Sequence, residues 1–221
     1  MTDKITVLRT LGGLRMTKTW RADGSIGDYD TARRFTTQQL PVDSVHTLAA
    51  VLAELQDDPH ACVIRGTYPP DHGKHVIRRL DATTDAPHHW FLVDIDKFTP
   101  VISDPVLDPV GAIEEYLEAH LPMLLDTSFY WKLSSSAGHP KNRDILKAHV
   151  WFYNHTAYSS DEMEAWARST QGAVDVVGLR QVQPLYTASP VMEDGAVDPV
   201  PHRSGFYQGC LHDSAQLTLD P

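Results

Sequence analysis

Hydrophobic residues recur along the chain with two spacings, one typical of helices and one of strands. Over 43–56 the apolar positions repeat every three or four residues behind Asp43 and Ser44, either of which can cap a helix. An Asp-Pro pair at 108–109 predicts the start of a second helix that runs over 110–120. The capping-box pattern Ser-Ser-Asp-Glu at 159–162 predicts the start of a third helix, and Gly172 would end that helix.

Short apolar runs predict the strands, which we expect at 61–66, 89–96, 129–134, 146–154, 174–177 and 182–186. The run at 89–96 is apolar and nearly continuous until Asp94 and Asp96, as in a central strand. Residues 1–35 have only weak periodicity, and no element is predicted there. Helices and strands interleave without strict alternation, which indicates an α+β or a mixed α/β fold.

Composition places the chain among globular proteins. It has 221 residues, of which 42% are hydrophobic and 22% charged, so one core or two small ones can form. We find neither a run apolar enough to cross a bilayer nor a secretory signal at the start of the sequence. The two cysteines, Cys62 and Cys210, cannot make a disulfide framework, so we expect a reducing, cytoplasmic setting.

Charge is distributed unevenly along the chain. The formal net charge of −10 argues against a surface that binds nucleic acid all over. Basic residues outnumber acids in 62–81 and 132–149, whereas 94–126 contains eight acids and one lysine. A local basic cleft is therefore compatible with the acidic total.

Three aspartates are candidate metal ligands. Asp94 and Asp96 lie two apart at the end of an apolar strand, so both carboxylates face one side and can hold a divalent cation. Asp-x-Asp alone is a weak signal, because the chain also has Asp28-Tyr29-Asp30. Asp175 interrupts a short apolar run and would complete a three-carboxylate site. The alternative is that these acids mark a strand end in solvent and a turn after Gly172.

A Ser/Gly turn followed by a strand histidine is a candidate anion site. The stretch Ser134-Ser135-Ser136-Ala137-Gly138 can direct hydroxyls and backbone N–H groups toward a phosphate, and Lys147 and His149 share one face of the next strand. The alternative is a polar hairpin beside an ordinary histidine. None of the twelve histidines forms a recognised zinc-ligand pair, so a structural zinc is not expected.

The order of these motifs resembles the archaeo-eukaryotic primase superfamily. An Asp-x-Asp strand, a Ser/Gly turn leading to a strand histidine, and a lone Asp after a helix occur in the same order in the primase-polymerase modules of phage, plasmid and mobile-element replication proteins. The likeness extends over about 14–205 and includes 63–66, Arg78-Arg79 and the segment 183–190. The chain departs from the family pattern in having Lys147, where a serine often stands two residues before the histidine.

The resemblance implies a fold, an activity and a set of site residues. It implies an α+β fold with an N-terminal αβ unit over about 1–85, an RRM-like catalytic unit over about 86–210 and the active site between them, all within one domain, 1–221. It implies template-directed nucleotidyl transfer as a DNA primase or primase-polymerase. The implied site residues fall into three groups: Asp94, Asp96 and Asp175 as catalytic metal ligands for two Mg²⁺ or Mn²⁺ ions; Ser134, Ser136, Lys147, His149 and Arg180 for the nucleotide; Arg65, Arg78 and Arg79 for the template.

The partners that the resemblance implies are a single-stranded DNA template, NTPs or dNTPs, and a helicase domain or subunit; no membrane is involved. We also expect the chain to be the front part of a longer replication protein. Two other functions explain part of the pattern. A metal-dependent glycosyltransferase would use Asp94 and Asp96 but gives no role to His149 or Asp175. A non-catalytic RRM-like module that binds nucleic acid would need none of the three aspartates.

Overall fold

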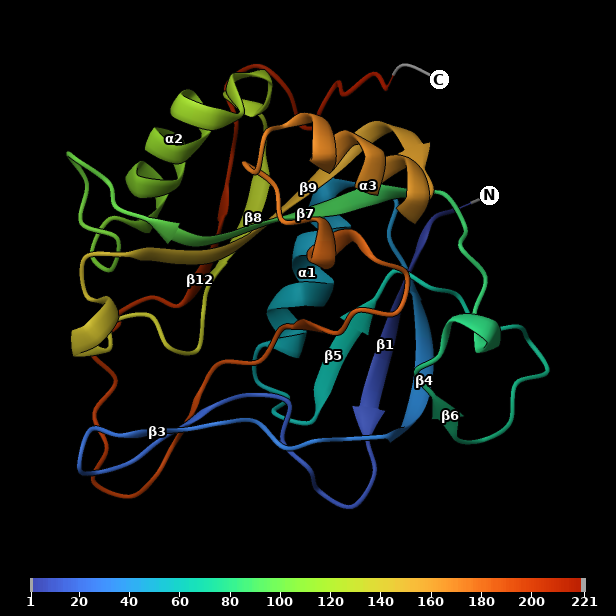
Figure 1. The fold of residues 1–221 in the computed structure, drawn as a ribbon, viewed down its shortest axis with the longest axis horizontal. Helices are drawn as coiled ribbons and strands as arrows, with labels where there is room; N and C mark the ends of the chain where they lie inside the picture. The colour runs from blue at the N-terminus through green and yellow to red at the C-terminus, as the bar shows by residue number, and fades with distance from the viewer. Residues whose placement is uncertain (1, 220–221) are drawn as a thin grey trace.

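A computed structural model describes residues 2–219 of the chain and has an α+β architecture, as the sequence predicts. The three α-helices within this range are α1 (Val45–Leu55), α2 (Pro109–His120) and α3 (Ser160–Ser169). Twelve strands in the described part of the chain form three sheets, and Figure 1 shows α1 between the two larger ones. The described helices are all too short or too polar to span a bilayer.

The first sheet has five strands in the order β10-β5-β1-β4-β6. Their bounds are β1 (Lys4–Thr10), β4 (Arg34–Pro41), β5 (Ala61–Ile64), β6 (Val76–Ile77) and β10 (Leu185–Tyr186). Residues 1–35, for which the sequence predicts no particular element, contain β1, the central strand of this sheet. Ile5 and Val7 pack toward α1, whereas Leu8 packs on the opposite face. Both faces are covered, and polar Thr6 and Arg9 between the apolar residues concealed the strand in the sequence.

The second sheet is antiparallel and contains the strands that carry the candidate chemistry. Its order is β12-β8-β9-β7, with β7 (His88–Phe98), β8 (Phe129–Leu133), β9 (Leu146–Tyr158) and β12 (Ser204–Tyr207). Alternate residues of β7 face two different cores. Phe91, Val93 and Ile95 pack with α2 and α3, and Trp90 and Leu92 pack with α1 and the first sheet.

A third, small sheet joins distant parts of the chain. It has the order β11-β2-β3, with β2 (Thr19–Trp20), β3 (Ile26–Gly27) and β11 (Val191–Met192). Both β10 and β11 come from the second half of the sequence and pair with strands of the first half. A boundary near residue 85 therefore does not separate two independent segments, since 185–192 returns to the N-terminal unit.

The helix starts follow the predicted caps. Ser44 accepts a hydrogen bond from the Thr47 backbone N–H at the start of α1, and Asp108 precedes α2 with Pro109 in its first turn. Ser159 and Glu162 form the expected capping box at α3.

Two predicted strands in the second half of the chain are wrong or shorter than expected. Residues 174–177 do not form a strand: Asp175 caps a 3-10 helix, η4 (Val176–Leu179), by accepting from the Val177 N–H at 2.9 Å. The strand expected at 182–186 is confined to β10. A polar side chain that satisfies a free backbone N–H competes with strand pairing, which explains the helical turn at Asp175.

Candidate active site

Asp94 and Asp96 lie where the inner face of β7 leaves the core. Trp90 and Leu92 precede them on the same face and are buried. The Asp94 side chain is 30% exposed and the Asp96 side chain 59% exposed. β7 is an edge strand, so its end is open on one side. The strand thus places two carboxylates at the mouth of the interface between the sheets.

The turn that carries Asp175 packs against this strand end. Gly178 of η4 lies so close that a Cβ there would be 3.5 Å from Leu92 Cδ2 and 4.0 Å from Asp94 Cβ. The Tyr116 hydroxyl donates to the Ala173 carbonyl and ties the α3–η4 connection to α2. As a result Asp94, Asp96 and Asp175 line one cleft of about 750 Å³. The structure brings the three predicted carboxylates to the same cleft.

The environment of Asp94 favours its neutral form over its charged form. Burial raises the pKa of Asp94, and the negative charges of Asp96 and Asp175 act in the same direction, while His149 and Lys147 oppose them. A bound cation would stabilise the charged form of such a carboxylate, because it offsets both the burial and the neighbouring negative charges. A raised pKa produced by burial and by like charges in a cleft is a common feature of functional sites.

A row of three ionisable side chains crosses the sheet beside the cleft. Asp94 on β7 is the register partner of His149 on β9, and His149 is in turn the partner of Lys132 on β8. His149 Nε2 lies 3.6 Å from Asp94 Oδ1. Because register partners on adjacent antiparallel strands share a face, the row places an imidazole beside the first carboxylate and an amino group beside the imidazole.

A second row runs parallel to the first, nearer to solvent. The Lys147 ammonium on β9 forms an ion pair with Asp96. The Ser134 backbone N–H donates to the Lys147 carbonyl at 2.8 Å, so the start of the Ser/Gly turn lies beside Lys147. Lys147 therefore supplies a counter-charge to the second carboxylate.

Lys132 is a site residue that sequence analysis did not identify. It is 3% exposed, and its ammonium makes one long hydrogen bond, 3.4 Å to the Leu133 carbonyl. Burial lowers the pKa of Lys132 to about 7; the charge of Arg203 adds to this effect and Asp198 opposes it. The signal in the sequence was a lysine inside the apolar run Phe129–Leu133, where a buried charge needs a partner.

Lys132 and His149 line a cavity of about 210 Å³ between the second sheet and the N-terminal unit. Ser134, Ser135 and Lys18 also line it. Thr17, Tyr29 and Tyr186 complete the part of the lining nearest the N-terminal unit and the returning segment. We call this space the cationic pocket. Its donors are hydroxyls, an imidazole and two ammonium groups, a set suited to an anion such as phosphate.

The three serines of the turn have different positions. Ser135 is fixed by the N-terminal unit, because its hydroxyl lies 2.9 Å from Thr17 Oγ1 and its carbonyl accepts from the Trp20 indole at 2.8 Å. Ser134 faces the cationic pocket, whereas Ser136 lines a neighbouring groove of about 480 Å³ with Lys147. Of the two predicted serines, Ser134 is the one beside His149.

Arg65 is not available to a template, which corrects its predicted role. It is 1% exposed and sits over the Trp90 ring at 5.2 Å. Its guanidinium donates to the Trp90 and Tyr158 carbonyls at 2.6 and 2.8 Å and to the Ser160 hydroxyl at 3.2 Å. Burial lowers the pKa of Arg65 to about 10. With its donors engaged inside the protein, Arg65 joins β5, β7 and the start of α3.

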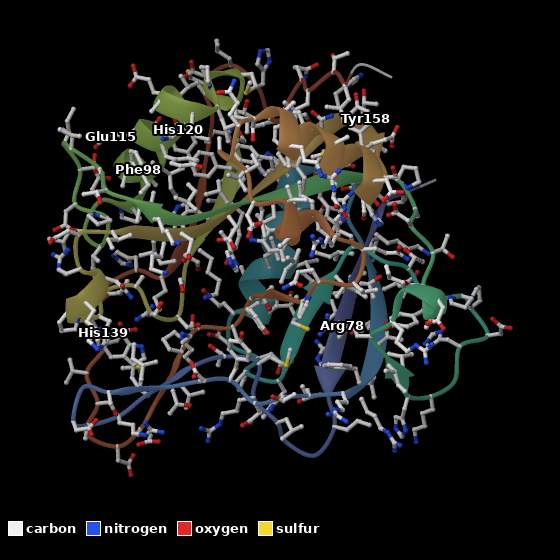
Figure 2. All side chains as sticks on the ribbon, viewed as in Figure 1. Arg78, Phe98, Glu115, His120, His139 and Tyr158 are labelled. Atoms are coloured by element: carbon white, nitrogen blue, oxygen red, sulfur yellow. The ribbon has the colours of Figure 1, made fainter. Side chains whose placement is uncertain are left out.

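The other three predicted arginines contact groups other than the three aspartates. Arg180 was assigned to the nucleotide, but it is exposed and reaches Glu164 on α3 at 4.0 Å. Arg78 is half-buried and donates to the Val182 carbonyl, and Figure 2 shows it on the first sheet, far from Phe98 and His120. Arg79 is exposed and pairs with Asp81. Only Arg78 and Arg79 remain candidates for a template contact.

The donor set fits an open site for a hard divalent cation. Within residues 2–219, no three acidic, histidine or cysteine side chains are gathered closely enough to enclose an ion. Mg²⁺ commonly binds through one or two carboxylates and completes its shell with water and substrate phosphate, so it needs no closed cage. Asp94 and Asp96, with Asp175 across the cleft, suit that kind of binding.

Comparisons of the chain with protein-family models, with curated proteins and with solved structures found no match.

Proposed function

We propose that the protein is a nucleotidyltransferase of the primase-polymerase type, which joins nucleotides on a single-stranded DNA template. One observation carries the proposal. A carboxylate cleft and a cationic pocket adjoin at the Asp94–His149 contact, at 3.6 Å. A nucleoside triphosphate needs this combination, because its α-phosphate reacts at the metals while its terminal phosphates need cationic donors.

The assignment gives each side chain of the two rows a separate task. Lys132 and His149 bind the β- and γ-phosphates and stabilise the charge that develops on the leaving pyrophosphate. Ser134 adds a hydroxyl donor, and Lys147 keeps Asp96 in position until the substrate arrives. Divalent ions at Asp94, Asp96 and Asp175 would lower the pKa of the attacking hydroxyl and stabilise both the entering and the leaving oxygen.

The template, the helicase partner and the membership of the primase superfamily belong to the same proposal. They are supported by the order of the motifs and by the α+β architecture with a site between its sheets. A glycosyltransferase would also place a diphosphate beside an Asp-x-Asp strand, and the cationic pocket alone does not distinguish the two functions. Asp175 favours nucleotidyl transfer, because this third carboxylate faces the cleft with Asp94 and Asp96.

A single assay tests the proposal. The protein is incubated with single-stranded DNA, labelled NTPs or dNTPs and Mn²⁺ or Mg²⁺, with and without an annealed primer. We expect metal-dependent incorporation that is lost in Asp94→Asn and kept in Asp30→Asn, the control in the other Asp-x-Asp pair. Turnover of UDP-sugars with no incorporation would instead support a glycosyltransferase. Binding of DNA without either reaction would support a non-catalytic module.

A further inference from the structure

The three carboxylates separate two cavities of different character. The cationic pocket lies on the β8–β9 side of Asp94, toward Lys132. The larger cleft of about 750 Å³ lies beyond the open edge of β7, against α2 and the end of α3. Asp94 on the edge strand stands between them, next to His149 on one side and lining the cleft on the other.

The far wall of the cleft is aromatic and apolar. Phe98, Tyr116 and His120 form a cluster with ring centroids 4.7–5.8 Å apart, and Met123 is 55% exposed beside it. All four line the cleft. Figure 2 shows Phe98 and His120 next to each other at α2. We call these four residues the aromatic wall.

An irregularity in β7 builds this wall next to the carboxylates. Phe98 follows Asp94 and Asp96 at a spacing of two, so a regular strand would direct all three toward the same face. The pairing of β7 with β9 shifts register between Ile95 and Phe98, and Phe98 contacts Tyr116 on α2 instead. Bulges at sheet edges commonly redirect a side chain near an active site.

The geometry of phosphoryl displacement then assigns a different reacting group to each of the two cavities. The attacking and leaving oxygens lie on opposite sides of the phosphorus in an in-line reaction. With the leaving pyrophosphate at Lys132 and His149, the attacking hydroxyl must approach from the cleft side of the carboxylates. We infer that the cleft binds the 3′-terminal nucleotide of the strand being extended, with its base and sugar against the aromatic wall.

This inference rests on the proposed function and adds the site of the second substrate. In the step that it places, the 3′-oxygen forms a bond to the α-phosphorus of the incoming nucleotide. The bond from that phosphorus to the bridging oxygen breaks, and pyrophosphate leaves with the electron pair toward the cationic pocket. The hydroxyl proton passes to water in the open cleft. The cleft volume suits one nucleotide, because small-molecule sites commonly measure about 300–1,000 Å³.

Steady-state primer extension with His120→Ala tests the inference. His120 is exposed and its ring faces the cleft, so its removal should leave the fold intact. Stacking of a base on an aromatic side chain is worth about 1–3 kcal/mol, so we expect KM for the primed template to rise roughly tenfold or more. KM for the nucleotide should change less than about twofold. His120→Tyr should restore most of the affinity, and His155→Ala, at an exposed position of β9, should match the wild type.

A crosslink provides a second measurement that does not depend on turnover. A primer with 5-iodouracil as its 3′-terminal base is bound to the wild-type protein and irradiated. We expect the label in the tryptic peptide 98–132, which contains the whole aromatic wall. Label in 133–141 or in 19–21, on the other side of the carboxylates, overturns the inference.

The outcomes separate this inference from the proposed function. A wild-type protein that incorporates no nucleotide overturns both. The inference alone is overturned if the wild-type protein extends primers but His120→Ala leaves KM for the primed template and KM for the nucleotide unchanged. It is also overturned if His120→Ala raises KM for the nucleotide instead. In both cases the proposed function stays in place.

Discussion

His149 Nε2 on β9 lies 3.6 Å from Asp94 Oδ1 on β7, at the point where the buried faces of the two strands become accessible. The contact joins a carboxyl group whose pKa is raised by burial to an imidazole that opposes this shift. It also marks the boundary between the carboxylate cleft and the cationic pocket. Substitution of each partner therefore reports on a different half of the proposed reaction.

Asp94→Asn should abolish nucleotide incorporation while making the fold more stable. Loss of a metal-binding carboxylate should lower kcat by about 10³-fold or more, since it removes several kcal/mol of transition-state stabilisation. The pKa of Asp94 is raised in the folded protein, so its contribution to stability is lost as the pH rises above 3.8 through the folded pKa. In buffer with EDTA, Tm of Asp94→Asn should exceed that of the wild type at pH 7 and approach it near pH 3.

Asp30→Asn provides the matched control, because Asp30 belongs to the other Asp-x-Asp pair and is exposed. Its side chain accepts from the Arg15 backbone N–H at 2.7 Å, a hydrogen bond that the asparagine oxygen can keep, so neither activity nor Tm should change. Comparable primer extension by Asp94→Asn and Asp30→Asn would contradict the site assignment.

His149→Ala should weaken nucleotide binding without reducing metal binding. A charge-assisted hydrogen bond to phosphate is worth about 1.5–3 kcal/mol, which corresponds to an increase in Kd of about 10- to 150-fold. Nucleotide affinity can be measured by calorimetry with Ca²⁺, which supports binding without turnover. His155→Ala on the same strand is the control. An unchanged Kd in His149→Ala would show that His149 has only a structural role.

Lys132 should make both stability and nucleotide affinity depend on pH above neutrality. Its folded pKa of about 7 lies below its ordinary value of 10.5, so the unfolded chain binds the proton more tightly. The free energy of unfolding should therefore rise from about pH 7 toward pH 10.5, with the full cost of the buried charge present below pH 7. Replacing a buried charge by an apolar residue commonly stabilises a protein by about 1–4 kcal/mol. Lys132→Met should therefore be more stable than the wild type at pH 6, and this difference should be smaller at pH 10.

Nucleotide binding should take up a proton at Lys132 when the pH is above 7. Phosphate favours the ammonium form, so Kd should increase by up to about tenfold per pH unit above pH 7. His149, Arg203 and Asp198 are the other ionisable groups near Lys132. The difference between wild type and Lys132→Met isolates the lysine, and calorimetry in two buffers of different ionisation enthalpy measures the uptake. The same pH profile in both proteins would contradict the role of Lys132.

The local signals in the sequence identified most elements, and long-range pairing explains those they missed. The caps at Ser44, Asp108 and Ser159 act within one turn, so they were visible without the fold. The strand β1 is central only because β4 and β5 cover its two edges. Nothing within 1–35 specifies those partners.

In the candidate site too, some positions follow from local sequence signals and others from long-range strand pairing. The carboxylates at Asp94 and Asp96 follow from strand alternation, whereas the position of Lys132 follows from strand order, which places β8 beside β9. Arg65 illustrates the opposite error. The resemblance implies that Arg65 contacts the template, but Arg65 donates to the carbonyls of Trp90 and Tyr158 and is held in the interior.

Arg65→Met should destabilise the protein rather than weaken DNA binding alone. It removes three hydrogen bonds and leaves the Trp90 and Tyr158 carbonyls without these donors in the interior. Loss of a buried charged group with its partners left in place commonly costs about 3–5 kcal/mol, which urea unfolding can measure. Arg65→Lys should recover little, since an ammonium cannot reproduce the planar fork of donors. A folded, fully stable Arg65→Met with reduced affinity for DNA would restore the template role.

The protein should bind bare single-stranded DNA weakly, with a shallow dependence on salt. The net charge is −10, Arg65 is buried, and Arg79 is paired with Asp81, so few cations can face a strand. Each neutralised phosphate contributes about 0.7 to the slope of log K against log salt, so two or three contacts give a slope of about −1.4 to −2.1. Mn²⁺ with an incoming nucleotide should tighten binding, because the ions cancel the charges of the three aspartates that otherwise repel the strand.

Fluorescence anisotropy across a salt series measures that slope. The double variant Arg78→Ala with Arg79→Ala should flatten it without changing metal affinity, because neither residue lies among those that line the carboxylate cleft. Asp94→Asn should bind DNA slightly better than the wild type in the absence of metal, since it removes one of the repelling charges. Nanomolar binding with a steep salt slope in the absence of metal would contradict this prediction. Such binding requires many more phosphate contacts than the exposed basic side chains of 62–81 and 132–149 provide.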